Sequence, residues 1–403
     1  MFETPFDHYL TYGSTDQRTL RELQDSFTGL IVPGTVAAFQ REGTGGFVLT
    51  FSATQAATPY LIDSRFPLFQ KKLTKPKKSH IELASVLGDP SLVSTNSDPG
   101  PGGFTPERVD LIARSWVEFN QGYQHAANAK FDKYAQRLNE PVVPEQARSP
   151  QFVLAPYTMT FGTNDPWWNV SRMLYDRTCH HLGDPEKCLR VIASTGATGL
   201  SSLLRELPDS RALIWVSNLD ELESSLTALR TYARAIQEVR DGLQLFALYG
   251  GFFSVLLSAF GLMGSCHGIG FGEHRAYPEL QRSGPPPSRF YMPTLHRYVP
   301  TDLAYQLWRH DPALAECGCR VCNGLPPVAL DYHSLMMHSV LCRASEIEEW
   351  VGLDKIQIID RLEVERSTYL DNLARSSAPG IIKERGEVAA DPMYNWIQVL
   401  STL

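Results

Sequence analysis

Three short apolar runs decide the fold class: CLRVIASTG at 188–196, RALIWVSN at 211–218 and LQLFALYG at 243–250. Runs of this length, rich in aliphatic residues and followed by Gly, Ser or Asn, are typical of parallel strands that are buried on both faces. Between the second and third runs, apolar residues recur at helical spacing from Leu219 to Val239. Strands that alternate with helices predict a parallel sheet with right-handed crossovers.

The same alternation extends along most of the chain. A second helical pattern runs from Pro106 to Leu138, and the helix at 219–239 has Asn218 as a candidate N-cap with Glu221 at the capping-box position. About eight strands favour a closed barrel over an open sheet, so we expect an α/β protein built as a (β/α)8 TIM-type barrel. The five further runs with strand composition are TGLIVPGTVAAF (28–39), GGFVLTFSA (45–53), TPYLIDSRF (58–66), SPQFVLAPY (149–157) and GIGFGE (268–273).

One stretch needs a separate decision, because residues 243–272 contain no Asp, Glu, Lys or Arg and are long enough to cross a bilayer. Its seven glycines favour a strand, a helix at FFSVLLSAFGLM (252–263) and a returning strand. We therefore expect a buried barrel unit and no membrane span, with the uncharged helix packed under the metal-binding segment or against a second subunit. The segment MFETPFDHYL lacks the pattern of a secretory signal, so we expect a cytoplasmic protein.

The sequence ECGCRVCNG at 316–324 places three cysteines as C-x-C-x-x-C, at Cys317, Cys319 and Cys322. Three thiolates in so short a loop can converge on one tetrahedral ion, with a later side chain as fourth ligand. We choose His338 as that ligand, with His333 in reserve. The ion we expect is a closed, structural zinc; an iron–sulfur cluster that uses Cys342 and a chance grouping of cysteines are the alternatives.

These residues resemble the tRNA-guanine transglycosylase superfamily, whose α/β barrels exchange a guanine in nucleic acid for a 7-deazaguanine and carry a C-x-C-x-x-C zinc site closed by a downstream His. The resemblance runs over roughly residues 30 to 345. It implies a barrel with loop insertions at 1–293 and a zinc-binding and helical segment packed on it at 294–403. It also implies a purine or deazapurine substrate and either a homo-oligomer or a hetero-oligomer.

The resemblance assigns site residues by position. YLIDSRFPLFQ is similar to the family's strand that ends in Asp-Ser before Phe-Gln, which makes Asp63 the pocket carboxylate. RVIASTG and ALIWVSNLDE match the next strand ends that contact the base. The substrate-binding residues implied in this way are Ser64, Phe69, Gln70, Ser194 and Asn218.

Two positions depart from the family pattern. Ala155-Pro156 stands where a second pocket Asp is expected, and Cys266-His267 stands where the nucleophilic Asp is expected. An oxocarbenium-like transition state needs a nearby carboxylate. Glu273 is the remaining candidate, so Asp63 and Glu273 are the predicted catalytic residues.

Three neighbours complete the predicted site: His267, His274 and Arg275 as substrate-binding groups. Plain structural roles compete with each of these assignments. Asp63 can instead cap a helix or pair with Arg65, residues 272–275 can form a solvated loop with a local salt bridge, and His267 can be a core histidine.

Nucleic-acid contact requires a local patch, because the net charge is −7. The densest basic run lies soon after Asp63 and would contact tRNA or DNA phosphates, unless it is simply a solvated face. Trp167-Trp168 can stack a base or anchor a loop. The lysines of the run are Lys71, Lys72, Lys75, Lys77 and Lys78.

The sequence therefore favours a transglycosylase-like enzyme that exchanges a guanine-type base at an N-glycosidic bond of tRNA or DNA. The loss of the expected nucleophile supports one alternative, a catalytically inactive zinc-braced partner subunit. The acidic surface supports another, a small-molecule nucleoside N-glycosidase.

Overall fold

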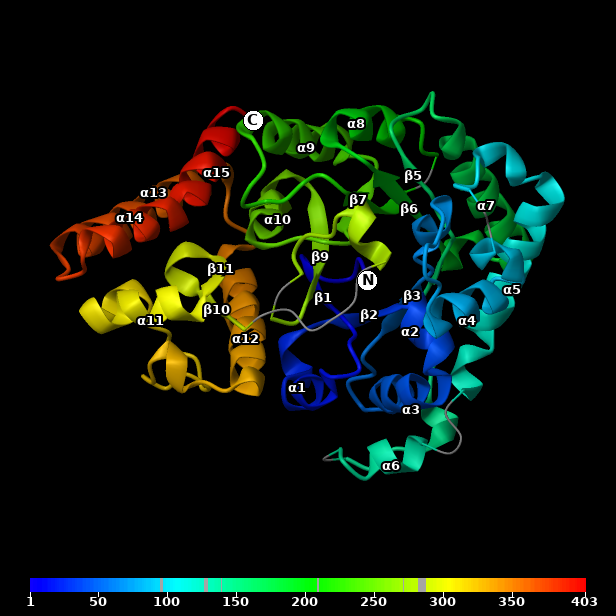
Figure 1. Ribbon diagram of the computed structural model, residues 1–403, viewed down its shortest axis with the longest axis horizontal. Coiled ribbons are helices and arrows are strands. Elements are labelled where there is room, and N and C mark those ends of the chain that lie inside the picture. Colours follow the sequence, from blue (N-terminus) through cyan, green and yellow to red (C-terminus); the bar gives the residue numbers. More distant parts are fainter. Residues whose placement is uncertain (95–96, 127–129, 139, 209, 271, 282–287) are drawn as a thin grey trace.

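The computed structural model describes residues 1–403 except 95–96, 127–129, 139, 209, 271 and 282–287. Its centre is a curled sheet in which all described strand pairs are parallel, and helices lie around it (Figure 1). The strands are β1 (Asp7–Thr11), β2 (Gly29–Pro33), β3 (Tyr60–Asp63), β4 (Val153–Leu154), β5 (Met159–Thr160), β6 (Cys188–Ser194), β7 (Arg211–Val216), β8 (Gln244–Ala247) and β9 (Leu262–Gly268).

The strands follow one another in the order β3-β2-β1-β9-β8-β7-β6-β4, and β5 also pairs with β6. β4 and β5 are thus two short pieces beside the same neighbour, which gives eight strand positions. The first strand pairs with the last, and the two ends of the ladder, β3 and β4, lie side by side. Between these ends the backbone N–H of Gln151 donates to the carbonyl of Tyr60 at 2.9 Å.

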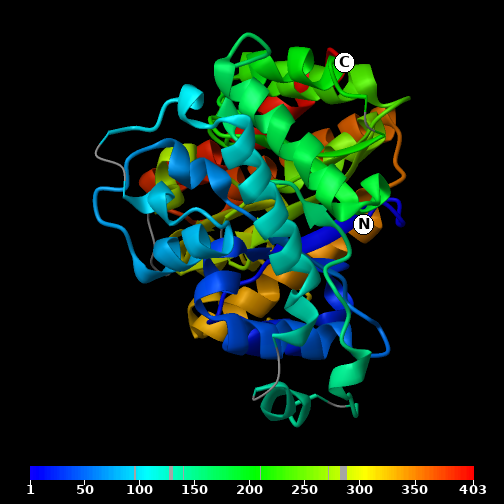
Figure 2. The same cartoon turned by 90° about the vertical axis from the view of Figure 1, so that its right-hand side faces the viewer.

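Helices cover the outer face of the sheet, and their apolar sides complete the core. Figure 2 shows α5 and α7 across one side, and these two helices pack on each other. Short α6 (Phe131–Ala135) lies at the margin of the molecule in both views. Together with α6, the helices of this part are α1 (Gln17–Glu22), α2 (Gly34–Phe39), α3 (Arg41–Ser52), α4 (Lys78–Val86), α5 (Pro106–Gln121), α7 (Pro166–Leu182), α8 (Ala197–Arg205), α9 (Leu226–Val239) and α10 (Phe252–Leu256).

Two of the eight predicted strands are wrong, and two real strands replace them. GGFVLTFSA lies in helix α3, where residues 44–52 are all buried; a short apolar run cannot distinguish a buried helix from a buried strand. The last strand is β9, which begins inside the predicted helix at 252–263 and shares only Gly268 with the predicted strand GIGFGE; Phe271 of that prediction lies outside the described residues. The first strand, β1, was not predicted.

The predicted helices were too long. The helix expected at 219–239 begins only at Leu226, and its N-cap is Ser225, whose hydroxyl accepts from the N–H of Ala228, instead of Asn218. The pattern at 106–138 divides into α5 and α6, with residues 127–129 outside the described part. The uncharged stretch at 243–272 forms β8, α10, a 3-10 turn and β9 as a buried unit.

The chain after the sheet forms a small hairpin and a helical layer. Helix α12 packs on α10 and on α1, so it occupies the place of the helix that would follow the last strand (Figure 1). The expected boundary at 293–294 falls inside the hairpin. The elements are β10 (Arg289–Met292), β11 (Arg297–Pro300), α11 (Thr301–His310), α12 (Tyr332–Trp350), α13 (Lys355–Arg375), α14 (Gly380–Ala389) and α15 (Asp391–Ser401).

Among the described residues, none of the helices combines the length and the apolar character that a bilayer crossing requires.

Candidate functional site

A Cys3His cluster lies between the loop after α11 and helix α12. The Sγ atoms of Cys317, Cys319 and Cys322 and a ring nitrogen of His338 all lie within 4.8 Å of one another. The Nδ1 atom of His338 is 3.1 Å from the Sγ of Cys322 and 3.6 Å from that of Cys319. Ligands bound to zinc at about 2.0–2.3 Å with tetrahedral angles are separated by about 3.5–3.8 Å. The spacing is therefore compatible with a structural metal site.

The His338 ring is oriented as metal-bound histidines are. Its Nε2–H donates to the carbonyl of Tyr291 at 2.6 Å, which leaves the Nδ1 lone pair facing the thiols. Phe290 stacks on the ring, with centroids 4.4 Å apart. Hydrogen bonds with Cys317 and Cys319 outweigh burial and raise the pKa of His338 to about 9. A metal ion and a proton compete for this nitrogen, because a histidine must be unprotonated there to bind metal.

The reserve ligand His333 lies outside the cluster, whereas a fourth sulfur, that of Cys342, lies at its edge. His333 is bonded through Nδ1 to Thr19 at 2.9 Å and through Nε2 to Glu22 at 3.0 Å. The Sγ of Cys342, one helical turn after His338, is 3.6 Å from that of Cys317 and 3.4 Å from Nδ1 of His338. The cluster thus contains the predicted ligands, and Cys342 lies beside them.

Asp63 is buried at the carboxyl end of β3, inside a group that we call the Asp63 cluster: Asp63, Arg65, Tyr157, Tyr249 and Arg275. Oδ1 of Asp63 accepts from the N–H of Arg65 and from the hydroxyl of Tyr157, both at 2.9 Å. The Nε of Arg65 lies 3.7 Å from Oδ2. Burial raises the pKa of Asp63, and the guanidinium of Arg65 opposes this shift. Both the predicted position and the competing ion pair are therefore present.

Two guanidinium groups face this single carboxylate. Arg65 has a left-handed backbone, with φ of 49°, that turns the chain sharply after β3. Burial and the charge of Arg65 lower the pKa of Arg275, and the buried Nε atoms of both arginines have no hydrogen-bond partner within the described part of the chain. The cluster has one more positive than negative side chain, so it can accept an anionic group.

The family's other base-pocket positions are occupied by internal contacts. Phe69 is fully buried beside Phe66. Gln70 donates to the carbonyl of Met159 at 3.0 Å and accepts from its N–H at 2.6 Å, which connects the turn after β3 to β5. The hydroxyl of Ser64 accepts from the N–H of Phe66 at 3.3 Å.

At the next strand ends, the contacts are again mostly local. The hydroxyl of Ser194 donates to the carbonyl of Gly196 at 2.8 Å. The side chain of Asn218 is exposed, and its backbone N–H donates to Thr195 at 3.0 Å. Of the predicted strand-end residues, Asn218 therefore has a side chain that lies in solvent.

Residues 272–281 lie across these strand ends, and we call them the covering segment. The indole Nε1–H of Trp215 donates to the carbonyl of Arg275, and the Ser217 hydroxyl accepts from the N–H of Tyr277, both at 2.8 Å. His274 donates from Nε2 to the carbonyl of Ser217 at 2.8 Å. On the other side the segment contacts the turn after β3, where Lys71 lies over the Tyr277 ring. His274 is therefore an anchor of this segment, whereas Arg275 points to the Asp63 cluster.

Glu273 belongs to a second group, the Glu273 cluster: Glu221, Glu273, Tyr291, Arg343 and Glu346. Nη2 of Arg343 contacts Oε1 of Glu273 at 2.5 Å, and Nε of Arg343 lies 3.5 Å from Glu346. Burial raises the pKa of Glu273 to about 8; Arg343 opposes this shift, and Glu221 and Glu346 add to it. The two predicted catalytic carboxylates therefore lie in different clusters.

Glu221 is buried, and its contacts differ from the predicted capping box. Its Oε2 accepts from the N–H of Gly251 at 3.0 Å, and its Oε1 accepts from the hydroxyl of Ser254 at 2.6 Å. A methyl group on Gly251 would lie 2.9 Å from Oε2 of both Glu221 and Glu273. The two carboxylates are thus close neighbours, and only glycine fits between them.

His267 lies on the opposite side of β9 from the Asp63 cluster. Cys266 faces inward, with its thiol 3.3 Å from the hydroxyl of Thr11, and the next side chain in a strand points the other way. There, Nε2 of His267 lies 2.8 Å from Nε2 of His8, and burial lowers the pKa of His267 to about 3. The structure does not bring this histidine to Asp63.

The aromatic pair flagged in the sequence anchors a loop, and a different ring is exposed. Trp168 is buried and donates to Glu206 at 2.9 Å, while Trp167 packs on Phe104. Phe161, just after β5, is 77% exposed. Phe161 was missed in the sequence, where its position just after a strand is the feature that marks it.

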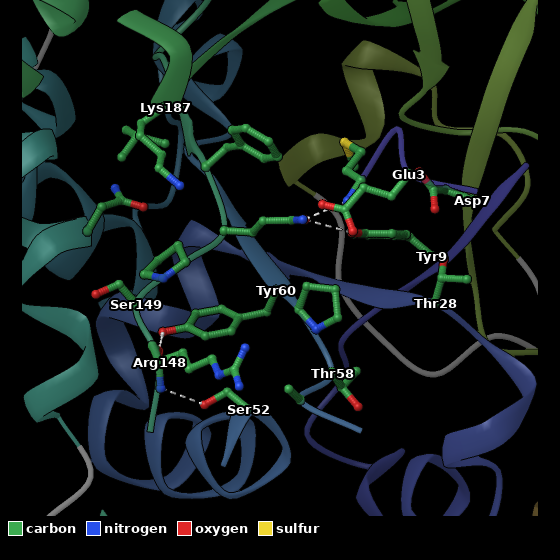
Figure 3. Close-up of a pocket in the computed structure, with 18 of the residues that line it drawn as sticks. Glu3, Asp7, Tyr9, Thr28, Ser52, Thr58, Tyr60, Arg148, Ser149 and Lys187 are labelled. Atoms are coloured by element: carbon green, nitrogen blue, oxygen red, sulfur yellow. Dashed lines mark hydrogen bonds between the residues drawn. The ribbon is translucent and has the colours of Figure 1, made fainter. Parts of the chain in front are cut away.

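A cavity of about 850 Å³ opens at the other end of the sheet (Figure 3). It is lined by residues at or just before the starts of strands, such as Asp7, Tyr60 and Lys187. Figure 3 shows Lys187 and Arg148 on one side and Glu3 and Asp7 on the other. Parallel-barrel enzymes work at the carboxyl ends of their strands, so this cavity is separate from the site that Asp63 marks.

The fold and the Cys3His cluster define a class, an α/β protein with a curled parallel sheet and a metal-binding type cluster after its last strand. A comparison of the sequence with protein-family models gives no match, and neither does a comparison with curated proteins.

Proposed function

We propose that this chain is a transglycosylase-like enzyme that exchanges a guanine-type base for a 7-deazaguanine at an N-glycosidic bond in tRNA or DNA. The observation that carries the proposal is the buried carboxylate of Asp63 at the carboxyl end of β3, beside two guanidinium groups. The order of the parts also agrees with the resemblance, because the Cys3His cluster follows the last strand. In the same proposal, the sheet is a closed (β/α)8 barrel whose ends meet at β3 and β4.

Zinc is the metal that we propose for the cluster. Cys317, Cys319, Cys322 and His338 would hold it with all four positions filled, so it would brace α12 against the loop and take no part in the reaction. Phe290 and the Tyr291 carbonyl would fix the His338 ring in place.

Asp63 would stabilise the positive charge that develops on the sugar as the base leaves. A preorganised carboxylate in a buried site is effective in this role because little water screens it. Arg65 and Arg275 would hold a phosphate of the substrate strand. The exchange balances, since the leaving purine takes up the proton that the entering base releases. The covering segment must move aside for a nucleotide to reach Asp63.

A non-catalytic partner subunit is the second candidate, and one observation favours it. Arg343 binds Glu273 in a cluster separate from that of Asp63, so the carboxylate expected to replace the missing nucleophile is engaged elsewhere. In this role the chain would keep its metal brace and pair with an active subunit in a hetero-oligomer, whereas the enzyme of the first proposal could form a homo-oligomer.

The test is incorporation of labelled guanine or a labelled 7-deazaguanine into tRNA and into DNA. We expect incorporation by the wild type and a loss of at least a hundred-fold in Asp63→Asn, which keeps the shape of the side chain and removes its charge. Asp241→Asn is the matched control, because that side chain is 93% exposed. Incorporation that Asp63→Asn leaves unchanged would refute the role of Asp63, and activity that appears only with a second protein would support the partner role.

A further inference from the structure

Phe161 has the largest exposed fraction, 77%, of any large hydrophobic side chain within the described part of the protein. Single exposed apolar residues are common. This one is unusual because of its position: it directly follows β5, at the same end of the sheet as Asp63. Its neighbour Thr160 is in register with Ser194 at the end of β6.

The backbone that carries this ring is held on several sides. The N–H of Phe161 donates to Oδ2 of Asp165 at 2.9 Å, and the same carboxylate caps α7. A methyl group on Gly199 would lie 2.3 Å from the Phe161 carbonyl, so α8 packs directly against it. The N–H of Thr195 donates to Thr160 at 2.9 Å. The ring therefore projects into solvent from a fixed base, and a ligand that stacks on it would pay little ordering entropy.

A positive charge lies on the adjoining segment. Gln70 forms two hydrogen bonds with the backbone of Met159, which is two residues before Phe161. Lys71 follows Gln70 and is exposed, and it opens the basic run that continues to Lys78. The Nζ atom of Lys71 lies over the Tyr277 ring of the covering segment. An exposed ring and exposed lysines at one end of a sheet match the way proteins hold single-stranded nucleic acid, with the ring stacking a base and the cations contacting phosphates.

We propose that Phe161 is a stacking platform for a base of the substrate strand that flanks the exchanged nucleotide. This inference rests on the proposed function, since it takes nucleic acid as the substrate. The residues that follow Phe161 are Gly162, Thr163 and Asn164, so the ring leads into a loop of small and polar residues.

The test measures the affinity of the full chain for a fluorescent single-stranded oligonucleotide and for a tRNA over a range of salt concentrations. Phe161→Ala should weaken binding about ten-fold, and Phe161→Trp should retain it, because stacking contributes about 1–3 kcal/mol per base. The matched control is Phe39→Ala, another exposed phenylalanine, 46% exposed, at the end of α2, which leads away from the strand ends. It should bind as the wild type does.

The salt dependence separates stacking from charge. Phe161→Ala should shift affinity equally at all salt concentrations, whereas Lys71→Ala should reduce the slope of log affinity against log salt. Wild-type affinity in Phe161→Ala would overturn the platform while leaving the proposed function intact. A wild type that binds neither nucleic acid would overturn both.

Discussion

Glu273→Gln should remove a loss of folding stability that the wild type shows as the pH rises from 5 to 7. The substitution keeps the shape of the side chain and one oxygen for Arg343, but the amide does not titrate. Burial raises the pKa of Glu273 from its usual 4.5 to about 8. Between these values the folded chain holds a proton that the unfolded chain releases, so the free energy of unfolding falls as the pH rises.

The size of this effect follows from the pH interval between the pKa values of Glu273 in the unfolded and the folded chain. One titrating group changes the free energy of unfolding by at most about 1.4 kcal/mol per pH unit, so the wild type should lose about 2–3 kcal/mol relative to Glu273→Gln between pH 5 and 7. Urea unfolding at pH 5, 6 and 7 measures the difference between the two curves, in which contributions of other groups cancel. Glu223→Gln, at a side chain that is 75% exposed, is the control and should run parallel to the wild type. Parallel curves for Glu273→Gln would refute a buried, proton-holding carboxyl at this position.

Further predictions concern the metal cluster and its neighbour. The purified chain should contain one equivalent of zinc by elemental analysis. Cys319→Ser should abolish tight binding, whereas Cys342→Ser should retain it, and equal loss in both variants would show that the sulfur of Cys342 is a ligand. Arg343→Met should lower the free energy of unfolding by about 3–5 kcal/mol, because it removes the buried guanidinium that contacts the carboxyl groups of Glu273 and Glu346 and leaves Glu346 with His296 as its basic partner. A loss below about 1 kcal/mol in urea unfolding would contradict that ion-pair assignment.

The fold class could be predicted because most strands are short, branched and apolar, as β6, β7 and β8 are. The number of strand positions agreed partly through compensating errors. Residues 45–53 were predicted as a strand and form a fully buried helix, while β1 was missed because its sequence, DHYLT, has polar residues that internal hydrogen bonds satisfy. Asp7 accepts from Thr4, and His8 bonds to Ser26. Hydrogen bonds to loop residues or to residues distant in the sequence cannot be recognised from the local pattern of polar and apolar residues.

The cysteine cluster was predictable because three of its ligands lie within six residues, and His338, chosen over His333 as the fourth ligand, lies in the cluster. The strand-end groups were harder. Asp63 follows an apolar run, which marks it, but nothing in the sequence near Glu273 indicates that its main partner is Arg343, seventy positions later. Glu221 was predicted as a capping residue of the following helix, and instead its carboxylate caps a different helix, α10.

Helix α12 connects these two parts of the molecule. His338 faces the thiols, and Arg343, a little more than one turn further along, reaches Glu273 beside the strand ends. The position of Arg343 therefore depends on the same helix that the metal cluster fixes. A closed metal site that performs no chemistry would still matter for the strand ends, because releasing the ion would loosen the helix that supplies the guanidinium contact of Glu273. The Cys3His cluster and the contact between Arg343 and Glu273 therefore belong to one structural unit on α12. This unit supports the sheet, and the chemistry proposed for Asp63 lies on the inner side of that sheet.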